Sequence, residues 1–394
     1  MIARRQTLLL LAHTALTQIV VFVLRPTTAY RAIELDVPAA GLGVLSASFA
    51  LAPLVLALPS GQFVDRFGEK RVMLAGSAIL CLAGALFIVI GDSIAGLIAA
   101  SIGLGTGQLC CVVGQQASIA NTVGPGQHDT AFGHYTFAAS LGQMLGPAMI
   151  LLFGGRETIP DTARIFVWST LLIVLLLGCT LLLRDPPRQR RESDAASGGV
   201  RALVRIPGLM RAVMASGVLL AAVDITLVYL PALGAERGLA SGVVGLLLAV
   251  RAGSSMVSRF FLGHLSRLVG RRRLLLASFF VTAATLVLAP VPQPLWLLLV
   301  VVTLLGFGLG VGPPLTMSWV SEAAPPGLRG RAIALRITGN RIGQVLIPSA
   351  VGVVAGGAGV AGVLWATSAA LVAVTFGVRG LRDSATPREE EVSS

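Results

Sequence analysis

Gly61-Gln62-Phe63-Val64-Asp65-Arg66-Phe67-Gly68-Glu69-Lys70-Arg71 is a short charged stretch between two long apolar runs. A second stretch, Gly263-His264-Leu265-Ser266-Arg267-Leu268-Val269-Gly270-Arg271-Arg272-Arg273, repeats its frame, with two glycines seven residues apart and basic residues after the second glycine. Glycine permits tight turns and close helix approach, and a cationic cluster keeps a loop on the cytoplasmic side of a bilayer. We therefore expect each stretch to connect two transmembrane helices in the cytoplasm.

The composition places the chain in a membrane. Of its 394 residues, 55% are hydrophobic and 12% are charged, and the formal net charge is +12. A soluble protein of this length carries more charge. The arginines form short clusters between apolar runs rather than one basic face, so we attribute the positive charge to membrane topology and expect no nucleic-acid partner.

The sequence carries no pattern typical of an enzyme or a metal site. The four histidines are scattered, and the four cysteines lie inside apolar runs without a Cys-x-x-Cys motif. Metal ligands and nucleophile–base pairs need partners at suitable spacing. We therefore expect no metal, no catalytic residues and no cofactor beyond an ion gradient.

Apolar runs of about twenty residues can cross a bilayer as helices, and twelve such runs can be placed. We expect these spans near residues 6–34, 40–60, 71–90, 94–116, 131–154, 163–183, 208–233, 241–262, 273–291, 295–318, 331–355 and 359–379. The predicted organisation is an N-terminal six-helix half (1–183), a basic cytoplasmic linker (184–207), a C-terminal six-helix half (208–380) and a cytoplasmic tail (381–394).

The distribution of basic residues orients the spans. Arginine and lysine are concentrated in the loops after spans 2, 6, 8 and 10, whereas the loops on the other side are close to neutral. Loops rich in these residues stay in the cytoplasm. Both termini are therefore expected to be cytoplasmic.

The two halves of the chain repeat each other. Gly103, Gly105 and Gly107 correspond to Gly306, Gly308 and Gly310, and Gly142-Gln143 with Pro147 corresponds to Gly343-Gln344 with Pro348, at offsets of 201 to 203 residues. Such duplication predicts two pseudo-symmetric halves around an axis along the membrane normal.

The opening stretch resembles the signature loop between helices 2 and 3 of the major facilitator superfamily, G-x-L-a-D-r-x-G-r-k. Gly61, Asp65, Arg66, Gly68 and Lys70 fit that pattern, whereas Glu69 departs from it, and Arg267 stands where the second copy would carry Asp. The resemblance implies an all-α integral membrane fold of twelve helices. It further implies a secondary transporter in a bacterial inner membrane that works by rocker-switch alternating access. The five fitting residues are then expected to act in conformational gating. We expect a monomer.

Span 5 gives a signal for the direction of transport. Gly133, Gly142, Gly146 and Pro147 fit most of the superfamily's exporter signature, although its final glycine pair is absent. We favour export, with Gly142, Gly146 and Pro147 as gating residues; the alternative is ordinary close packing of helices. Span 4 lacks the arginine of many proton-coupled drug exporters, which leaves the coupling ion open.

Polar residues deep in the spans mark the expected substrate site, because each is costly in a membrane. Arg251 lies about 15 Å into span 8, followed on one face by serines that we expect to line a cavity. The candidate substrate-binding residues are Gln18, Arg25, Gln115, Arg251, Ser255, Arg336, Asn340 and Arg341. Two alternatives stay open: Arg336 can snorkel to the interface, and Arg25 is interfacial if its helix ends at Pro26.

Asp224 is the acidic residue well inside a span of the second half. It either pairs with Arg251 as a structural contact or exchanges protons during transport.

A positive cavity favours anions, since arginine matches carboxylate and phosphate geometry. We expect a proton-coupled transporter of a small organic anion that exports rather than imports its substrate. The alternatives are a proton-coupled multidrug efflux antiporter for lipophilic or cationic drugs and a membrane sensor that no longer transports.

Overall fold

All regular structure within the described ranges is helical. The computed structural model describes residues 2–122, 128–154, 157–184, 206, 208–323, 329–354 and 357–378. The first half of the chain forms α1 (Ile2–Glu34), α2 (Ala39–Phe67), α3 (Glu69–Val89), α4 (Ile94–Thr122), α5 (His128–Gly154) and α6 (Thr162–Leu182). The second half forms α8 (Leu209–Glu236), α9 (Ser241–Phe260), α10 (Leu262–Val269), α11 (Arg271–Leu288), α12 (Leu295–Ala323), α13 (Arg329–Val354) and α14 (Gly359–Val378). Each expected span begins within four residues of a helix start.

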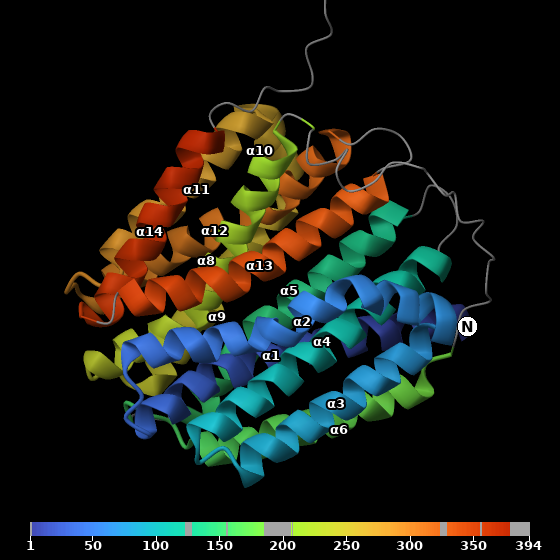
Figure 1. Ribbon diagram of the computed structural model, residues 1–394, viewed down its shortest axis with the longest axis horizontal. Coiled ribbons are helices and arrows are strands. Elements are labelled where there is room, and N and C mark those ends of the chain that lie inside the picture. The colour runs from blue at the N-terminus through green and yellow to red at the C-terminus, as the bar shows by residue number, and fades with distance from the viewer. Residues whose placement is uncertain are drawn as a thin grey trace, which may run out of the picture.

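The helices form two groups with the same internal packing. Figure 1 shows α1–α6, coloured blue to green, in the lower part of the view and α8–α14, coloured yellow-green to red, in the upper part. In the first group α1 contacts α5 and α6, and α3 contacts α4 and α6; in the second, α8 contacts α13 and α14, and α11 contacts α12 and α14. This is the expected pair of pseudo-symmetric halves. The predicted linker and tail lie outside the described residues, apart from residues 184 and 206.

Ten helices in the described ranges are long and apolar enough to cross a membrane. The remaining long helices, α11 and α13, fall short for physical reasons. α11 opens with Arg271, Arg272 and Arg273, and α13 carries polar residues along its length, including Arg336 and Asn340. A polar transmembrane helix is expected only where it faces the protein interior.

The charged stretches connect helices as expected, but most of each stretch is itself helical. α2 continues through Phe67, and the chain turns only at Gly68, where φ is 91° and ψ is 157°. In the second copy α9 ends at Phe260, the short α10 follows, and the turn comes at Gly270, with φ 85° and ψ 142°. This conformation is essentially restricted to glycine. The second glycine of each stretch is therefore the one on which the turn depends.

The glycines of α4 and α12 show the register of the duplication. Gly105 lies against Phe49 of α2, and Gly306 lies against Arg251 of α9, the helix equivalent to α2. Gly107 faces α3, and Gly308 faces the equivalent α11. Structurally equivalent glycines are therefore 201 residues apart in the sequence. The expected pairing of Gly105 with Gly308, 203 residues apart, is wrong, because Gly105 is equivalent to Gly306 instead.

The most extensive contacts between the halves are those of α2 with α13 and of α5 with α9, and α8 also contacts α1 and α2. A Cβ atom at Gly43 would lie 2.5 Å from the Pro348 oxygen, and one at Gly245 would lie 2.9 Å from the Pro147 oxygen. Both contacts lie at one end of the molecule, where the Tyr229 hydroxyl also donates to the Ala39 carbonyl at 2.8 Å. We call this the closed end.

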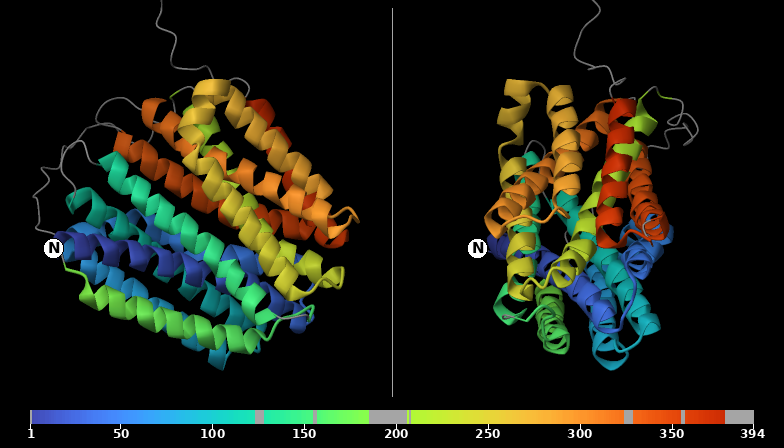
Figure 2. Two further views of the ribbon diagram at one scale, coloured as in Figure 1. Left: turned by 180° about the vertical axis from the view of Figure 1, so that it is seen from behind. Right: turned by 90° about the vertical axis from the view of Figure 1, so that its left-hand side faces the viewer.

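The end opposite the closed end, which borders the predicted linker, is called the linker end. There the two groups diverge: the N-terminus of α1 lies at the right of Figure 1 and α10 lies at the top. Figure 2 shows the same divergence from behind. The halves therefore meet at the closed end and separate toward the linker end.

Candidate functional site

Arg25 lies in the centre of the molecule. α1 continues through Pro26 as far as Glu34, and Arg25 is only 6% exposed. The alternative that the helix ends at Pro26 and leaves Arg25 at the interface is wrong. Its guanidinium lies over the Phe49 ring, 4.4 Å from the ring centroid, which adds a cation–π contact in a desolvated setting.

Arg25 of α1 forms an ion pair with Asp224 of α8, and the pair links the two halves. Both side chains are almost fully buried. The other carboxylate oxygen of Asp224 accepts a hydrogen bond from Gln344 Nε2 at 2.7 Å, and Gln344 Oε1 accepts one from Arg341 Nη1 at 3.0 Å. The expected partner of Asp224 was Arg251, which lies within electrostatic range but forms no hydrogen bond with it among the described contacts.

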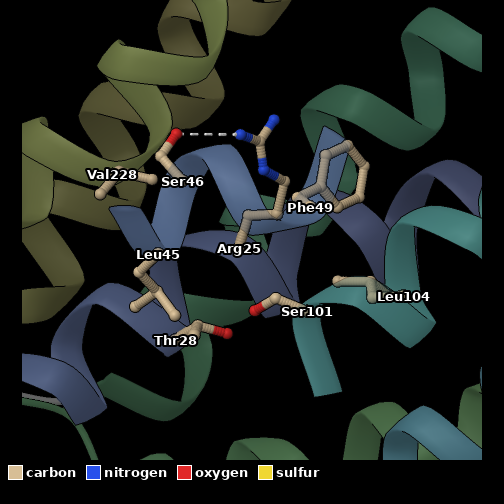
Figure 3. Close-up of a pocket in the computed structure, with 8 residues that line it drawn as sticks. All are labelled: Arg25, Thr28, Leu45, Ser46, Phe49, Ser101, Leu104 and Val228. Atoms are coloured by element: carbon tan, nitrogen blue, oxygen red, sulfur yellow. Dashed lines mark hydrogen bonds between the residues drawn. The ribbon is translucent and has the colours of Figure 1, made fainter. Parts of the chain in front are cut away.

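A small pocket lies beside this ion pair, between helices of the first half and α8 of the second half. It is lined by Arg25, Thr28, Leu45, Ser46, Phe49, Ser101, Leu104 and Val228. Figure 3 shows the Arg25 guanidinium reaching Ser46, to which it donates at 3.5 Å, with the Phe49 ring close to it. Thr28 and Ser101 place two further hydroxyl groups in the same view. The pocket therefore offers one guanidinium, three hydroxyls and an aromatic face.

Arg251 is fully interior at 2% exposure, and its Nε has no hydrogen-bond partner among the described residues. The spacing of the serines after Arg251 had indicated that they line a cavity. In the structure they do not. Ser255 donates to the Gly306 carbonyl at 2.6 Å and Ser254 donates to the Thr303 carbonyl at 2.7 Å. These hydroxyls bind backbone carbonyls of α12, so Ser255 contributes to helix packing.

Arg336 and Asn340 of α13 are both 8% exposed. Arg336 Nη2 donates to the Pro313 carbonyl at 2.8 Å and to the Thr316 hydroxyl at 3.4 Å. It points into the protein, which contradicts the snorkelling alternative. Asn340 Oδ1 and Arg336 Nε have no hydrogen-bond partner in the part of the chain that the structure describes, so both have hydrogen-bonding capacity to spare.

Gln18 and Gln115 lie in different surroundings. Gln18 is 6% exposed, and its Oε1 has no partner among the described side chains. Gln115 Nε2 instead lies 2.7 Å from His13 Nδ1 and donates to the Thr17 hydroxyl at 3.1 Å, and the Tyr135 hydroxyl donates to Gln115 Oε1 at 3.4 Å. Gln115 is thus bonded within the first half, away from the central ion pair.

The predicted gating residues of the opening stretch lie near the linker end. Gly61 and Asp65 belong to α2, but their side-chain environment lies outside the described residues. Arg66 is exposed, with its guanidinium carbon 5.3 Å from the centroid of the Phe67 ring. Lys70 Nζ donates to the Leu181 carbonyl at 2.9 Å, so this contact ties α3 to α6 inside one half.

The small residues of α5 bring it against α1. Cβ atoms added at Gly142 and Gly146 would meet backbone carbonyls of Ala15 and Ile19. Pro147 lies one residue further on, at the closed end beside Gly245. The structure therefore uses the first two residues for close contact within the first half and Pro147 for contact between halves.

Three residues near the central arginines carried no clear signal in the sequence. Ser46 and Phe49 of α2 lie in an apolar run without polar periodicity. Arg259 of α9 donates to the Ser140 hydroxyl of α5 at 3.2 Å, a contact between the halves. Its position eight residues after Arg251 could have drawn attention to it, because residues i and i+8 share one side of a helix.

The comparisons with known proteins agree with this architecture. A family model described as Major Facilitator Superfamily matches residues 10–239 and 212–393. The arabinose-proton symporter of Bacillus subtilis (strain 168) is 32% identical over 73 residues, a match that covers 18% of this chain and 16% of the symporter. The match thus spans less than a fifth of that relative's length.

Several solved structures share the fold over nearly the whole chain. A mutant of the nucleoside transporter NupG has a TM-score of 0.76 at 16% identity, covering 95% of this chain and 99% of that one. The D-xylose-proton symporter has a TM-score of 0.75 at 14% identity, and the match covers 94% of this chain and 96% of the symporter. XylE from E. coli in an inward open conformation has 0.74 at 15% identity, covering 95% of each chain. With the family match over most of its length, the chain belongs to the major facilitator superfamily and is a multi-pass membrane transporter.

Proposed function

We propose that the protein is a proton-coupled secondary transporter of a small organic anion. The substrate lies between the halves, where Arg25, Arg251 and Arg341 supply charge and Gln18 and Asn340 supply unused hydrogen-bonding groups. Asp224 carries the coupled proton.

The excess of buried positive charge is the observation that supports an anionic substrate. Arg25, Arg251 and Arg336 are at most 8% exposed, and Arg341 is partly buried. Asp224 is the one carboxylate among the described side chains that lies away from the helix ends. Uncompensated charges are costly inside a membrane protein. An anion that enters gains charge-assisted hydrogen bonds of about 1.5 to 3 kcal/mol each.

The ion pair supports the coupling. While Arg25 holds the Asp224 carboxylate, neither residue is free for a substrate or a proton. A substrate anion that binds Arg25 removes the counter-charge of Asp224, which then takes up a proton more readily. By reciprocity, a proton on Asp224 frees Arg25 and strengthens anion binding by the same factor.

This positive linkage favours movement of the anion and the proton in the same direction. We therefore propose symport. The α5 glycines favour export. Export by antiport requires proton and substrate to exclude each other. The two mechanisms differ in the sign of the pH effect on substrate affinity, so a binding titration distinguishes them.

The test is transport by purified protein in proteoliposomes, with anionic, neutral and cationic solutes compared under imposed pH gradients. We expect uptake of anions driven by inward proton movement, weaker binding in Arg251→Lys and weaker still in Arg251→Ala, because lysine keeps the charge but loses the planar fork. Transport of lipophilic cations alone, unaffected by Arg251→Ala, would establish the multidrug alternative. Binding without any transport would establish a sensor.

A neutral substrate is the second candidate, and two observations favour it. The relatives include an arabinose-proton symporter, a nucleoside transporter and a D-xylose-proton symporter. The pocket beside Arg25 also joins hydroxyl groups to an aromatic face, a combination suited to a sugar or nucleoside. Neutral sugars and nucleosides therefore belong in the same transport panel.

The placement in the membrane is also a proposal. We place the protein as a monomer in a bacterial cytoplasmic membrane. The linker 184–207 connects the halves 1–183 and 208–380, and both termini and this linker lie in the cytoplasm. The cluster Arg271–Arg273 at the linker end supports this orientation. Reporter fusions inserted in the linker test it, and an extracytoplasmic signal would contradict it.

A further inference from the structure

A second arginine stands two turns beyond Arg251 on α9. Arg259 follows Arg251 by eight residues within the same helix, so their Cα atoms are about 12 Å apart along the axis and about 80° apart around it. Arginine side chains are long enough for both guanidinium groups to bind one group between them. The two charges already lie within electrostatic range of each other.

The other interior arginines have ligands of their own. Arg25 binds Asp224, Arg336 binds the Pro313 carbonyl and the Thr316 hydroxyl, and Arg341 binds Gln344. They are therefore partly or fully satisfied without a substrate.

Arg336 and Arg341 also lack a carboxylate partner, but each binds a carbonyl or amide oxygen, whereas Arg251 and Arg259 bind neither among the described residues. Arg251 Nε has no hydrogen-bond partner within the described ranges, and the described contact of Arg259 is a hydroxyl, Ser140 Oγ. No salt bridge joins either to a carboxylate among the described residues. Arg251 is buried and Arg259 is half-buried, so water screens the repulsion between the two cations only in part.

The charge of the missing ligand follows from this count. A single negative charge compensates one of the two arginines and leaves the other unpaired. A ligand with two negative charges compensates both, and it can accept hydrogen bonds from two planar forks at once. We infer that Arg251 and Arg259 together form a dianion site, so that the substrate is a phosphate monoester or a dicarboxylate. This inference rests on the proposed anion transport and narrows its substrate class.

Arg259 also lies at the α5–α9 contact between the halves. A ligand held by both arginines competes with Ser140 for Arg259, and so it acts on a contact that joins the halves. A purely structural role would need only the hydrogen bond to Ser140. Removing Ser140 therefore separates the two roles, because it deletes that bond and leaves the charge in place.

The experiment compares ligands of matched shape and different charge on the purified full-length protein. Glucose 6-phosphate carries about two charges at pH 8, because the second pKa of a phosphate monoester is about 6, whereas glucose 6-sulfate carries one. Succinate and its monoamide form the equivalent carboxylate pair. We expect the dianion of at least one pair to bind about tenfold or more tightly than its partner, and the two pairs distinguish a phosphate ester from a dicarboxylate.

Variants assign the effect to Arg259. Arg259→Gln should reduce the ratio between the two affinities to near one while monoanion binding persists, and Arg259→Lys should keep part of the preference. Ser140→Ala should keep all of it. Arg267→Gln, on the exposed side of α10, is the matched control and should change nothing.

The outcomes separate the two levels of the proposal. Equal binding of dianions and monoanions by the wild-type protein would overturn the dianion site and leave anion transport intact. Binding of neutral sugars with no anion bound would overturn anion transport itself. Should Arg259→Gln fail to fold, the ratio of dianion to monoanion affinity in the wild-type protein and in Arg259→Lys still tests the dianion site. An unchanged ratio in Ser140→Ala excludes a merely structural role for Arg259.

Discussion

Arg25 and Asp224 are 199 residues apart in the chain, yet they form a buried ion pair that joins the two halves of the molecule. The pair lies between the closed end, where α2 meets α13 and α5 meets α9, and the linker end, where the halves diverge. A change of charge at either residue therefore acts on the one buried ion pair between the halves among the described residues.

Asp224→Asn should uncouple transport from protons and destabilise the protein. It leaves Arg25 buried without its counter-charge, which costs about 3 to 5 kcal/mol when one partner of a buried pair is removed. Substrate accumulation under a pH gradient should be lost, while exchange of substrate across the membrane persists. Unfolding and transport are measured from pH 5 to 8. The double variant Arg25→Gln/Asp224→Asn should recover part of the stability, and an unchanged pH dependence in Asp224→Asn would assign the proton to another residue.

Gly43→Ala should open the closed end. A Cβ there would lie 2.5 Å from the Pro348 oxygen and 3.2 Å from the Gly352 Cα, and such overpacking costs about 1 to 3 kcal/mol. That cost falls on the closed arrangement alone, so it shifts the balance between conformations by about 5- to 150-fold. Spin labels placed across the α2–α13 contact measure the opening. Gly178→Ala is the control, because a Cβ at Gly178 meets nothing within 4 Å.

The two turn glycines should be sensitive to substitution, and the other glycine of the second stretch should not. Gly68→Ala and Gly270→Ala place a side chain in a conformation that costs about 1 to 3 kcal/mol for other residues. Gly263 lies in α10 with nothing near its missing Cβ, and alanine is the better helix former. Unfolding in detergent should therefore show a loss for the first two variants and no loss for Gly263→Ala.

Gln115→Leu should affect stability rather than substrate binding. The substitution leaves the buried His13 Nδ1 and the Tyr135 hydroxyl without the hydrogen bonds that Gln115 provides, at a cost of about 1 to 3 kcal/mol. Substrate affinity should stay at the wild-type value. Gln108→Leu on the same helix controls for the loss of a polar side chain. A large drop in substrate affinity without a loss of protein stability would show that Gln115 binds the substrate.

Asp65→Asn should slow the transport cycle more than it weakens folding. The resemblance of the opening stretch to the superfamily signature implies that this acid stabilises the state in which the halves meet at the linker end. Transport rate and unfolding are compared in the same preparation. Wild-type transport by a well-folded Asp65→Asn protein would contradict the role, and Asp65→Glu, which keeps the charge, should be affected less.

The sequence predicted the helices well because membrane spans are constrained by length and hydropathy alone. It predicted their ends less well: α2 continues through Gly61 to Phe67 because nothing in that stretch except Gly68 requires a turn. Proline was also misleading at one point. Pro26 permits a helix to end, but packing against the rest of the first half keeps α1 helical beyond it.

The candidate site was predicted in part. Depth along a helix correctly made Arg251 and Asp224 interior residues, because depth follows from the rise per residue, whereas the position of Arg25 beside Pro26 left its depth open. Partners could not be predicted, since the distance between Asp224 and either arginine depends on how the halves meet. The serines after Arg251 illustrate the same limit: a polar stripe indicates a polar neighbour, and here the neighbour is the backbone of α12 rather than a cavity.

Pro348 gives the central ion pair a mechanical connection to the closed end. Proline has no backbone N–H, so it cannot donate to the carbonyl four residues earlier, which belongs to Gln344. α13 therefore lacks a backbone hydrogen bond at the residue whose side chain holds Asp224, and it is easiest to bend there. One turn further on, the Pro348 oxygen faces Gly43 across the halves. A bend at this point moves the Pro348 oxygen relative to Gly43, so the proton exchange that we propose at Asp224 would alter the contact between the halves at the closed end.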